Sequence, residues 1–345
     1  MKAIIVGAGV AGLGMGWRLA QAGVNTTVVE RGEAGMGASF AAAGMIAATA
    51  EMADAPPAEI AFAEQSRRLW PGFAAELEAA SGIAVGYRRN GAVLLDPWPD
   101  PLRPGTAWLD GPGVRERLPM LMAVEGGIWA PDEALADNRA LVRALAEAFR
   151  RAGGALMTGV EVTAVEERAV TTSAGHHAAD AVILAAGAWS GTLGLPTTPV
   201  KGQMIALMPP GEAASAHDGL MPDPVIWGNG VYLVPRADRL LVGATVEEAG
   251  FDLGLTKAAR QDLRARAELL IPALKDWTLV EHWAGLRPRS PDGLPLLGRL
   301  ANGVFAAGGQ YRNGILFAPA IAVHLRDLVL GRADGIPEFD PRRFA

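Results

Sequence analysis

Two arginines near the C-terminus stand among apolar residues and glycines, where a charge is costly to bury without an anionic partner. Arg287 and Arg312 are these residues. A guanidinium group carries a planar fork of donors that matches a carboxylate through two parallel hydrogen bonds. The two side chains therefore predict a site for a small carboxylated molecule. The alternative for Arg287 is a surface ion pair with an acid such as Glu281 or Asp292.

The other end of the chain carries a glycine turn with the Gly-x-Gly-x-x-Gly spacing. Gly7 permits the tight turn, Gly9 lets the backbone approach a pyrophosphate, and Gly12 lets the helix pack closely on the strand. The amides of Val10 and Ala11 then lie at the positive end of a helix, which favours phosphate groups. These residues predict a dinucleotide site.

The elements around this turn agree with that interpretation. We expect a strand at Lys2–Val6, a helix at Val10–Ala22 and a strand at Thr26–Glu30, which together form a βαβ unit. Glu30 ends the second strand at the position where a carboxylate accepts hydrogen bonds from ribose hydroxyls. A signal peptide is the alternative for this apolar start, but its repeated glycines are unfavourable in a helical segment.

Composition limits the classes of function. The 345 residues are 50% hydrophobic and 20% charged, with a net charge of -6, which gives no electrostatic reason to bind nucleic acid or an anionic membrane. The absence of cysteine excludes disulfides and thiolate chemistry, and the five histidines show no metal-ligand spacing, so no metal is expected. Apart from the N-terminal run, no apolar stretch approaches 18 residues, so no transmembrane helix is expected. We expect a cytoplasmic homo-oligomer.

The pattern along the chain predicts an α/β fold with a discontinuous cofactor domain. Helices are expected at 59–81, from Asp137 or Asn138 to Arg151, at 257–270 and at 313–330. Short strands are expected near 92–95, 160–165, 170–172, 181–186 and 304–307, and proline-rich residues 97–112 should lack regular structure. Alternating segments between 200 and 283 predict a mostly antiparallel sheet. We therefore expect a cofactor domain of residues 1–85, 135–199 and 285–345, and a substrate domain of residues 86–134 and 200–284.

Two later segments distinguish among dinucleotide cofactors. Asp180–Ser190 is a buried strand that runs into a small-residue turn at Gly187, and Gly303–Gly309 repeats this design. Together with Ala41–Met45, Tyr232–Arg236 and Trp283–Pro288, they resemble the FAD-dependent D-amino acid oxidase family, and within it the glycine oxidase group. The resemblance spans the chain and implies an FAD-binding Rossmann-type domain, of the glutathione reductase-like kind, with an inserted β-sheet domain.

The resemblance also implies the cofactor contacts. They come from the glycine turn, from the end of the second strand, from a small-residue segment and from the loop before the last helix: Gly7, Gly9, Val10, Ala11, Gly12, Glu30, Arg31, Ala38, Ser39, Ala43, Gly44, Met45, Val162, Gly187, Gln310, Tyr311, Arg312, Asn313, Gly314, Ile315 and Leu316. Two positions depart from the family. Gln310 stands where relatives often have histidine, and Val246 stands where a methionine-type side chain is familiar, which bears on the shape of the substrate pocket.

Physical arguments support this transfer. Small residues at 41–44 let the backbone lie near an isoalloxazine ring, although an alanine-rich helix start is the simpler interpretation of the same residues. A helix beginning at Asn313 would aim its positive end at the flavin. Without cysteine the cysteinyl flavin link of some relatives is impossible, so FAD should be bound non-covalently.

The family assigns substrate roles to Arg287, Tyr232 and Arg312. By default Tyr232 would be a core residue, and Arg312 serves the flavin as well as the substrate. Glu51 is a candidate at the entrance, with a solvated loop acid as the alternative. A small amino acid held by its carboxylate would pass its α-hydrogen to the flavin as hydride, and the imine would hydrolyse, or be handed to thiazole assembly in thiamine biosynthesis. Molecular oxygen would take the electrons and yield hydrogen peroxide.

Two rival functions remain compatible with the sequence. One is an oxidase or dehydrogenase of the same family that acts on sarcosine, proline or a D-amino acid. The other is a non-catalytic flavin-binding assembly subunit, which would have no need for Tyr232, Arg287 and Arg312 together.

Overall fold

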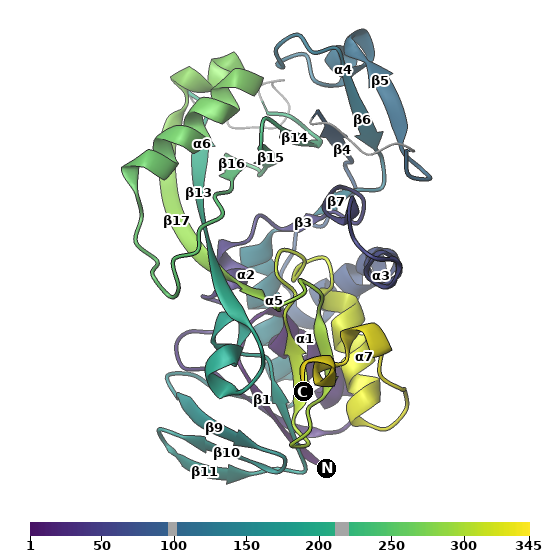
Figure 1. Ribbon diagram of the computed structural model, residues 1–345, viewed down its shortest axis with the longest axis vertical. Coiled ribbons are helices and arrows are strands. Elements are labelled where there is room, and N and C mark those ends of the chain that lie inside the picture. Colours follow the sequence, from purple (N-terminus) through teal and green to yellow (C-terminus); the bar gives the residue numbers. More distant parts are fainter. Residues whose placement is uncertain (96–101, 211–220) are drawn as a thin grey trace.

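The protein contains two large β-sheets stacked along its long axis (Figure 1). The structure is a computed structural model that describes residues 1–95, 102–210 and 221–345. A six-stranded sheet with its helices forms the lower half in Figure 1, and an eight-stranded sheet forms the upper half. Both chain ends lie in the lower half.

The six-stranded sheet has the order β18-β19-β12-β1-β2-β8, and its pairs are parallel except for β18 with β19. β1 lies inside the sheet and is apolar along most of its length, as expected for a parallel strand covered on both faces. The strands are β1 Lys2–Val6, β2 Asn25–Val29, β8 Ala155–Met157, β12 Ala181–Leu184, β18 Leu296–Arg299 and β19 Phe305–Gly308.

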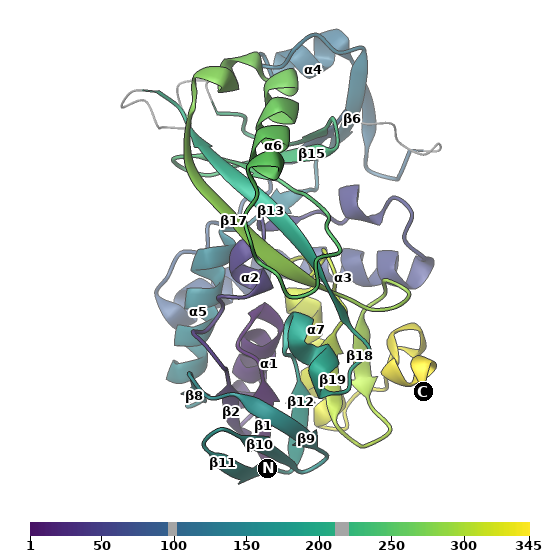
Figure 2. The same cartoon turned by 60° about the vertical axis from the view of Figure 1, so that its left-hand side comes forward.

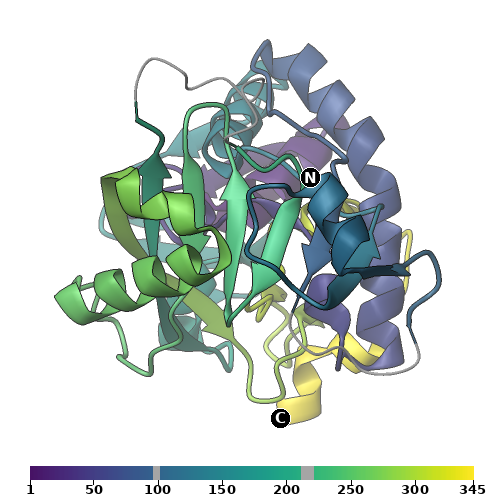
Figure 3. The same ribbon diagram turned by 90° about the horizontal axis from the view of Figure 1, so that it is seen from above.

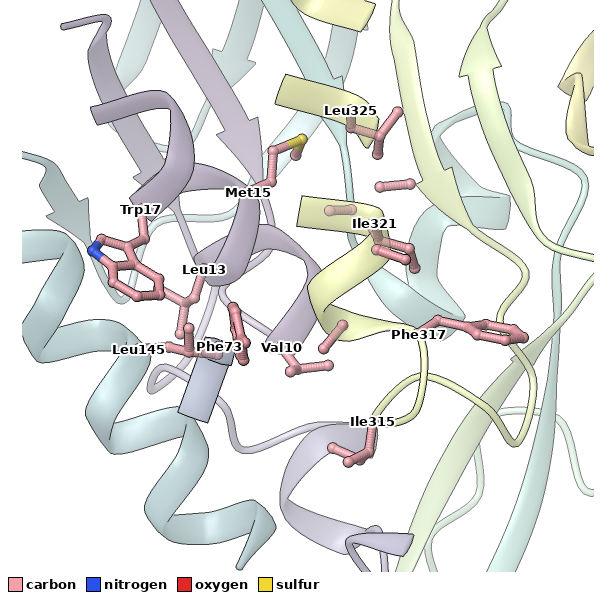
Figure 4. Close-up of a cluster of buried hydrophobic side chains, with 14 of the residues drawn as sticks. Val10, Leu13, Met15, Trp17, Phe73, Leu145, Ile315, Phe317, Ile321 and Leu325 are labelled. Carbon is pink, nitrogen blue, oxygen red and sulfur yellow. The ribbon is translucent and has the colours of Figure 1, made fainter. Parts of the chain in front are cut away.

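Helices pack around this sheet and enclose the larger core. They are α1 Val10–Gln21, α3 Pro57–Ser81, α5 Asn138–Arg151 and α7 Ala318–Val329. Figure 4 shows Leu13 and Trp17 of α1 near Phe73 and Leu145, and Trp17 meets Phe73 edge to face at 5.8 Å between ring centroids. The carboxylate of Asp137 caps α5 by accepting from two amides at its start.

The eight-stranded sheet has the order β17-β13-β16-β15-β14-β4-β6-β5 and is antiparallel except for β14 with β4. Its strands are β4 Ala92–Leu94, β5 Ala107–Asp110, β6 Gly126–Ala130, β13 Thr198–Met208, β14 Val225–Gly228, β15 Val231–Pro235, β16 Leu240–Gly243 and β17 Thr278–Arg289. β13 and β17 pair along their whole length and run from the upper sheet down to the lower half of the molecule (Figure 2). α6 Lys257–Leu270 packs on β13, β15 and β16, as the view from above shows (Figure 3).

Smaller elements complete the fold. A three-stranded antiparallel sheet contains β9 Val162–Glu166, β10 Ala169–Thr172 and β11 Gly175–Ala178, and β3 Met45–Ile46 pairs with β7 Ala134–Leu135. The short helices are α2 Ala38–Ala41, α4 Gly111–Arg117, η1 Ala50–Met52, η2 Gly187–Leu193, η3 Pro272–Asp276, η4 Pro337–Phe339 and η5 Pro341–Phe344. Among the described residues, no helix combines the length and apolar character needed to span a membrane.

The mixed α/β architecture predicted from the sequence is confirmed, whereas several boundaries are wrong. The last helix begins at Ala318 rather than Asn313, because Pro319 lacks an amide donor and fits only the first turn. Residues 107–117 form β5 and α4 despite their prolines, since Pro112 occupies the first turn of α4 and Asp110 caps it. Pro97, Pro99 and Pro101 lie outside the described residues.

The division into two domains remains a proposal. β17 continues past the expected boundary at residue 284 and ends at Arg289. One strand therefore belongs to the upper sheet at its start and reaches the lower half of the molecule at its end.

Candidate cofactor and substrate site

A long cleft of about 370 Å³ runs between the two halves of the molecule. Its walls come from the glycine turn after β1, from the segment 41–45 and from the loop 310–316. At its far end it reaches Tyr232 of β15 and Arg287 of β17. Residues from both sheets therefore line one continuous cavity.

Close backbone contacts shape the end of the cleft at the glycine turn. Gly7 has a φ of +106°, and a side chain there would clash with the carbonyl of Ala185. A side chain at Gly12 would clash with the carbonyl of Gly7. The amide of Val10, at the start of α1, donates to the Ser39 hydroxyl at 2.9 Å. The turn therefore places a helix N-terminus and a hydroxyl group together, as a pyrophosphate site requires.

The carboxylate of Glu30 lies beside this turn. It accepts hydrogen bonds from the amides of Ala8 at 2.9 Å and Gly32 at 3.0 Å. These bonds fix the carboxylate at the cleft wall, where its remaining lone pairs can accept from ribose hydroxyls. The Arg31 guanidinium lies 3.5 Å from the centre of the Trp189 ring, which also lines the cleft.

The small-residue segment passes along the middle of the cleft. α2 ends at Ala41, so the helix-start interpretation holds only up to that residue, and Ala42 turns to extended backbone. The indole of Trp283 donates to the carbonyl of Ala41 at 3.0 Å. A side chain at Gly285 would clash with Ala41. Residues 42–44 thus present backbone and small side chains to the cavity. That this wall lies against an isoalloxazine ring stays a prediction.

The loop 310–316 closes the cleft from the C-terminal side. The carbonyl of Leu316 accepts from the Ser66 hydroxyl at 2.6 Å and from the Trp70 indole at 3.0 Å, so the loop is held from behind. The Gln310 amide nitrogen and the Asn313 amide oxygen are buried and have no partner among the described residues. Because both residues line the cleft, they offer a donor and an acceptor to a bound heteroaromatic ring. The residues present therefore fit FAD.

Arg287 enters the substrate end of the cleft from β17. Its Nη1 donates to the carbonyls of Thr245 at 3.1 Å and Lys201 at 3.4 Å. The guanidinium lies over Gly202 of the neighbouring β13, where any side chain would clash with it. Glycine at 202 is therefore what gives the arginine room inside the cavity.

The alternative of a surface ion pair for Arg287 is contradicted. Glu281 pairs with Arg139 at 2.5 Å and Arg239 at 3.4 Å, and Asp292 pairs with Arg343 at 2.8 Å. Within the part of the chain that the structure describes, no ion pair involves Arg287. The site therefore contains a cation that faces a cavity without an anionic partner.

Tyr232 stands next to this cation. Its side chain is 6% exposed, and its hydroxyl lies 3.6 Å from the Met204 sulfur. Burial raises the pKa of Tyr232, and the positive charges of Arg287 and Arg312 act in the opposite direction. The phenol therefore stays protonated at neutral pH and available as a hydrogen-bond donor.

Arg312 differs from Arg287 because it has a carboxylate partner. Its Nε lies 3.3 Å from Glu51, whose side chain is 10% exposed. The Glu51 carboxylate raises the pKa of Arg312. Glu51 lines the cleft and is not a solvated loop acid.

A second carboxyl group, Glu133, lies close to the segment that precedes Glu51. The Thr49 amide donates to the buried Glu133 at 2.7 Å, and burial raises the pKa of Glu133 to about 7.

All the predicted cofactor and substrate residues line the cleft except Gly12, which supports the turn from behind. Val246 is 55% exposed and does not line it, so the expected influence on the pocket shape is not supported. Sequence reasoning missed Gly202, Met204 and Trp189 as lining residues. Gly202 gives only a weak signal in the sequence, because its importance depends on the Arg287 side chain that lies over it in the fold. In the described ranges, no three His, Asp or Glu residues are grouped as metal ligands.

Comparisons with known proteins agree with this geometry. The family model described as FAD dependent oxidoreductase matches residues 2–328. The chain is 39% identical to the bifunctional protein ThiO/ThiG of Synechocystis sp. over 99% of its length and spans about half (54%) of that protein. It is 34% identical to glycine oxidase of Geobacillus kaustophilus, covering 94% of this chain and 92% of that one. The crystal structure of glycine oxidase from Geobacillus kaustophilus superposes with a TM-score of 0.89 at 31% identity, covering 98% and 97% of the two chains.

Proposed function

Because the chain belongs to the family of FAD-dependent oxidoreductases, we propose that it is an amino acid oxidase acting on glycine or a similarly small amine. The substrate would be oxidised to an imine, which water hydrolyses to a 2-oxo acid and ammonia. Oxygen would be reduced to hydrogen peroxide. When bound, FAD supplies the two-electron acceptor for this oxidation.

Arg287 carries the proposal. Its Nη1 donates to two backbone carbonyls, and the guanidinium, which lies beside the Tyr232 phenol, has three further N–H donors with which it can bind a carboxylate. Tyr232 can donate a further hydrogen bond to the same carboxylate. Holding the substrate at this point orients its α-hydrogen, and positioning of this kind supplies a large part of the barrier reduction. A catalytic histidine or lysine is therefore not needed.

The size of the substrate end favours a small side chain. Tyr232 and Met204 are buried side chains that line this part of the cleft. The names of the relatives given above also support glycine.

An anaerobic titration of the yellow protein with glycine, sarcosine, D-alanine and D-proline tests this proposal. We expect glycine or sarcosine to bleach the flavin absorbance fastest and aerobic turnover to release peroxide. Faster bleaching by D-proline would indicate the rival amine specificity. Bleaching without peroxide on return of air would indicate a dehydrogenase. Failure of every amine to bleach the flavin would favour the non-catalytic subunit.

Three further properties are proposals of the same kind. FAD should leave the chain on denaturation, since there is no cysteine to hold it covalently, and filtration of the denatured protein tests this. A homo-oligomer is supported by the exposed apolar side chains of Trp108 and Leu269 and is tested by light scattering. A cytoplasmic location is the third proposal, and cell fractionation tests it.

A further inference from the structure

A third arginine lies behind the small-residue segment of the cleft. Arg236 is the residue directly after β15, four positions beyond Tyr232 of that strand. Its Nη2 donates to the carbonyls of Ala43 at 2.6 Å and Ala136 at 3.2 Å, and to the side-chain oxygen of Asn138 at 3.2 Å. Among residues 1–95, 102–210 and 221–345, none forms an ion pair with it.

This arrangement keeps a positive charge in a desolvated place. Burial lowers the pKa of Arg236 to about 10, with Asp137 acting in the opposite direction. The group therefore stays charged at neutral pH. Backbone carbonyls and one amide compensate for the lost water, but they leave the net charge in place.

The fit around Arg236 is tight and involves the wall of the cleft. Gly44 has a φ of +75°, and a side chain there would clash with the carbonyl of Ala136 and come within 2.6 Å of the guanidinium. The amide of Asn138 donates to the carbonyls of Ser39 at 2.8 Å and Phe40 at 2.9 Å. Arg236 and Asn138 thus hold the carbonyls of the 39–43 segment from the protein side.

The opposite side of the same segment faces the cavity. Ala43 and Gly44 line the cleft, and no residue of the described chain accepts a hydrogen bond from their amides. Fixing the Ala43 carbonyl from behind therefore also fixes the direction of the Gly44 amide, because the two groups belong to one planar peptide unit. The Arg236 charge lies one peptide unit behind the cavity wall, because the guanidinium bonds directly to the Ala43 carbonyl.

We propose that Arg236 is a positioning residue that fixes the Ala43–Gly44 wall against the flavin ring and, through its unpaired positive charge, raises the reduction potential of bound FAD. Reduction adds negative charge to the ring, and a nearby cation in a region of low dielectric stabilises that state more than the oxidised one. This inference rests on FAD binding and not on the identity of the amine.

The test compares the Arg236→Met, Arg236→Lys and Asn138→Ala variants with the wild type, each at saturating FAD. The reduction potential is measured against a redox dye with dithionite as reductant, so no amine substrate is needed. Arg236→Met should shift the equilibrium with the dye about tenfold toward the oxidised enzyme, which is about 30 mV for a two-electron couple. Arg236→Lys keeps the charge and should shift it much less. Asn138→Ala should change the visible spectrum of the flavin without a comparable shift.

Arg239→Met is the matched control. Arg239 lies three residues after Arg236 in the sequence, and its charge is paired with Asp238 at 2.7 Å. It should leave the potential unchanged. A wild-type potential in Arg236→Met, or equal shifts in Arg236→Lys and Arg236→Met, would overturn the proposal. Should Arg236→Met fail to fold, the comparison of Arg236→Lys with Asn138→Ala still decides, since a larger shift in Asn138→Ala contradicts an effect of charge. A wild-type response to amines does not affect this outcome.

Discussion

The two ends of the cleft are built in different ways. At the glycine turn, the groups that face the cavity are mainly backbone atoms and one carboxylate from a short stretch of chain between Gly7 and Gly32. At the substrate end, the groups are side chains of Tyr232, Arg287 and Arg312, which come from separate elements and meet only through the strand register of the upper sheet and the loop before α7.

This difference has an energetic consequence. Several backbone donors share the binding of a cofactor at the first end, so removal of one contact should weaken affinity modestly. At the second end one half-buried cation, Arg287, makes the charge-assisted bonds to the substrate, and its loss leaves the carboxylate without a charged partner at that point. Mutations at the two ends should therefore affect different quantities, FAD affinity at one end and turnover of amine at the other.

The largest effect is expected for Arg287→Ala. It removes both charge-assisted hydrogen bonds to the substrate carboxylate and misplaces the α-hydrogen. A loss of about 2–5 kcal/mol corresponds to a fall in kcat/KM of roughly 30- to 5000-fold. Steady-state peroxide production measures it. FAD content should stay normal, and Arg287→Lys should restore little, because lysine lacks the planar fork. Loss of FAD as the main defect would place Arg287 at the wrong end.

A smaller effect is expected for Gly202→Ala, which leaves every charged group in place. The added methyl would clash with the end of the flexible Arg287 side chain and displace it, at little cost to folding. Misplacement by about 1 Å can cost on the order of 100-fold in rate. We expect a higher KM with an unchanged melting temperature. Gly72→Ala in α3 is the control, since its methyl would meet open space. Equal kinetics in the two variants would refute the assignment of Gly202.

Glu30→Ala should weaken FAD binding by about 1–3 kcal/mol, since hydrogen bonds between the ribose and a charged carboxylate are lost. It also removes the acceptor of the Ala8 and Gly32 amides. Fluorescence titration of the apoprotein gives the dissociation constant, and kcat at saturating FAD should change little. An unchanged FAD affinity contradicts the role of Glu30.

The smallest effect on turnover is expected at Glu133, which belongs to neither end. Burial raises its pKa in the folded protein to about 7, above the ordinary glutamate value of 4.5, so the fold favours the protonated form. This contribution to stability is present below about pH 4.5 and is lost as the pH rises through about 7. Glu133→Gln should remove this loss, up to about 3 kcal/mol, between pH 5 and 8. Urea unfolding of both proteins at these two pH values measures the free energy of unfolding. The same change with pH in the wild type and in Glu133→Gln would contradict the prediction.

The same contrast explains what the sequence could predict. The glycine turn, β1, α1 and Glu30 are contiguous, and each residue type carries a local physical reason that can be recognised without the fold. The start of the last helix is likewise a local feature, since Pro319 fits only the first turn of α7. Both the glycine turn and the start of α7 can therefore be recognised from neighbouring residues alone.

The substrate end could be predicted only in part. The residue type of Arg287 and the family resemblance of the segment around it indicate a substrate role. Its partners, however, depend on the strand register that places Val200 opposite Arg287 and Gly202 opposite Gly285. Strand pairing across about 80 residues of sequence leaves no local pattern. Arg236 was missed as a site residue for the same reason, since its contacts at 43, 136 and 138 lie far from it in the chain.

Binding of acetate to the oxidised holoenzyme tests the central claim most directly, because acetate offers the carboxylate of the substrate without its amine. Its binding is followed by the change in the visible spectrum of the flavin. We predict saturable binding that competes with glycine in the wild type and in Glu30→Ala loaded with FAD, and a loss of at least about 30-fold in affinity in Arg287→Ala. The same acetate affinity in Arg287→Ala and the wild type would contradict the placement of the substrate carboxylate at Arg287.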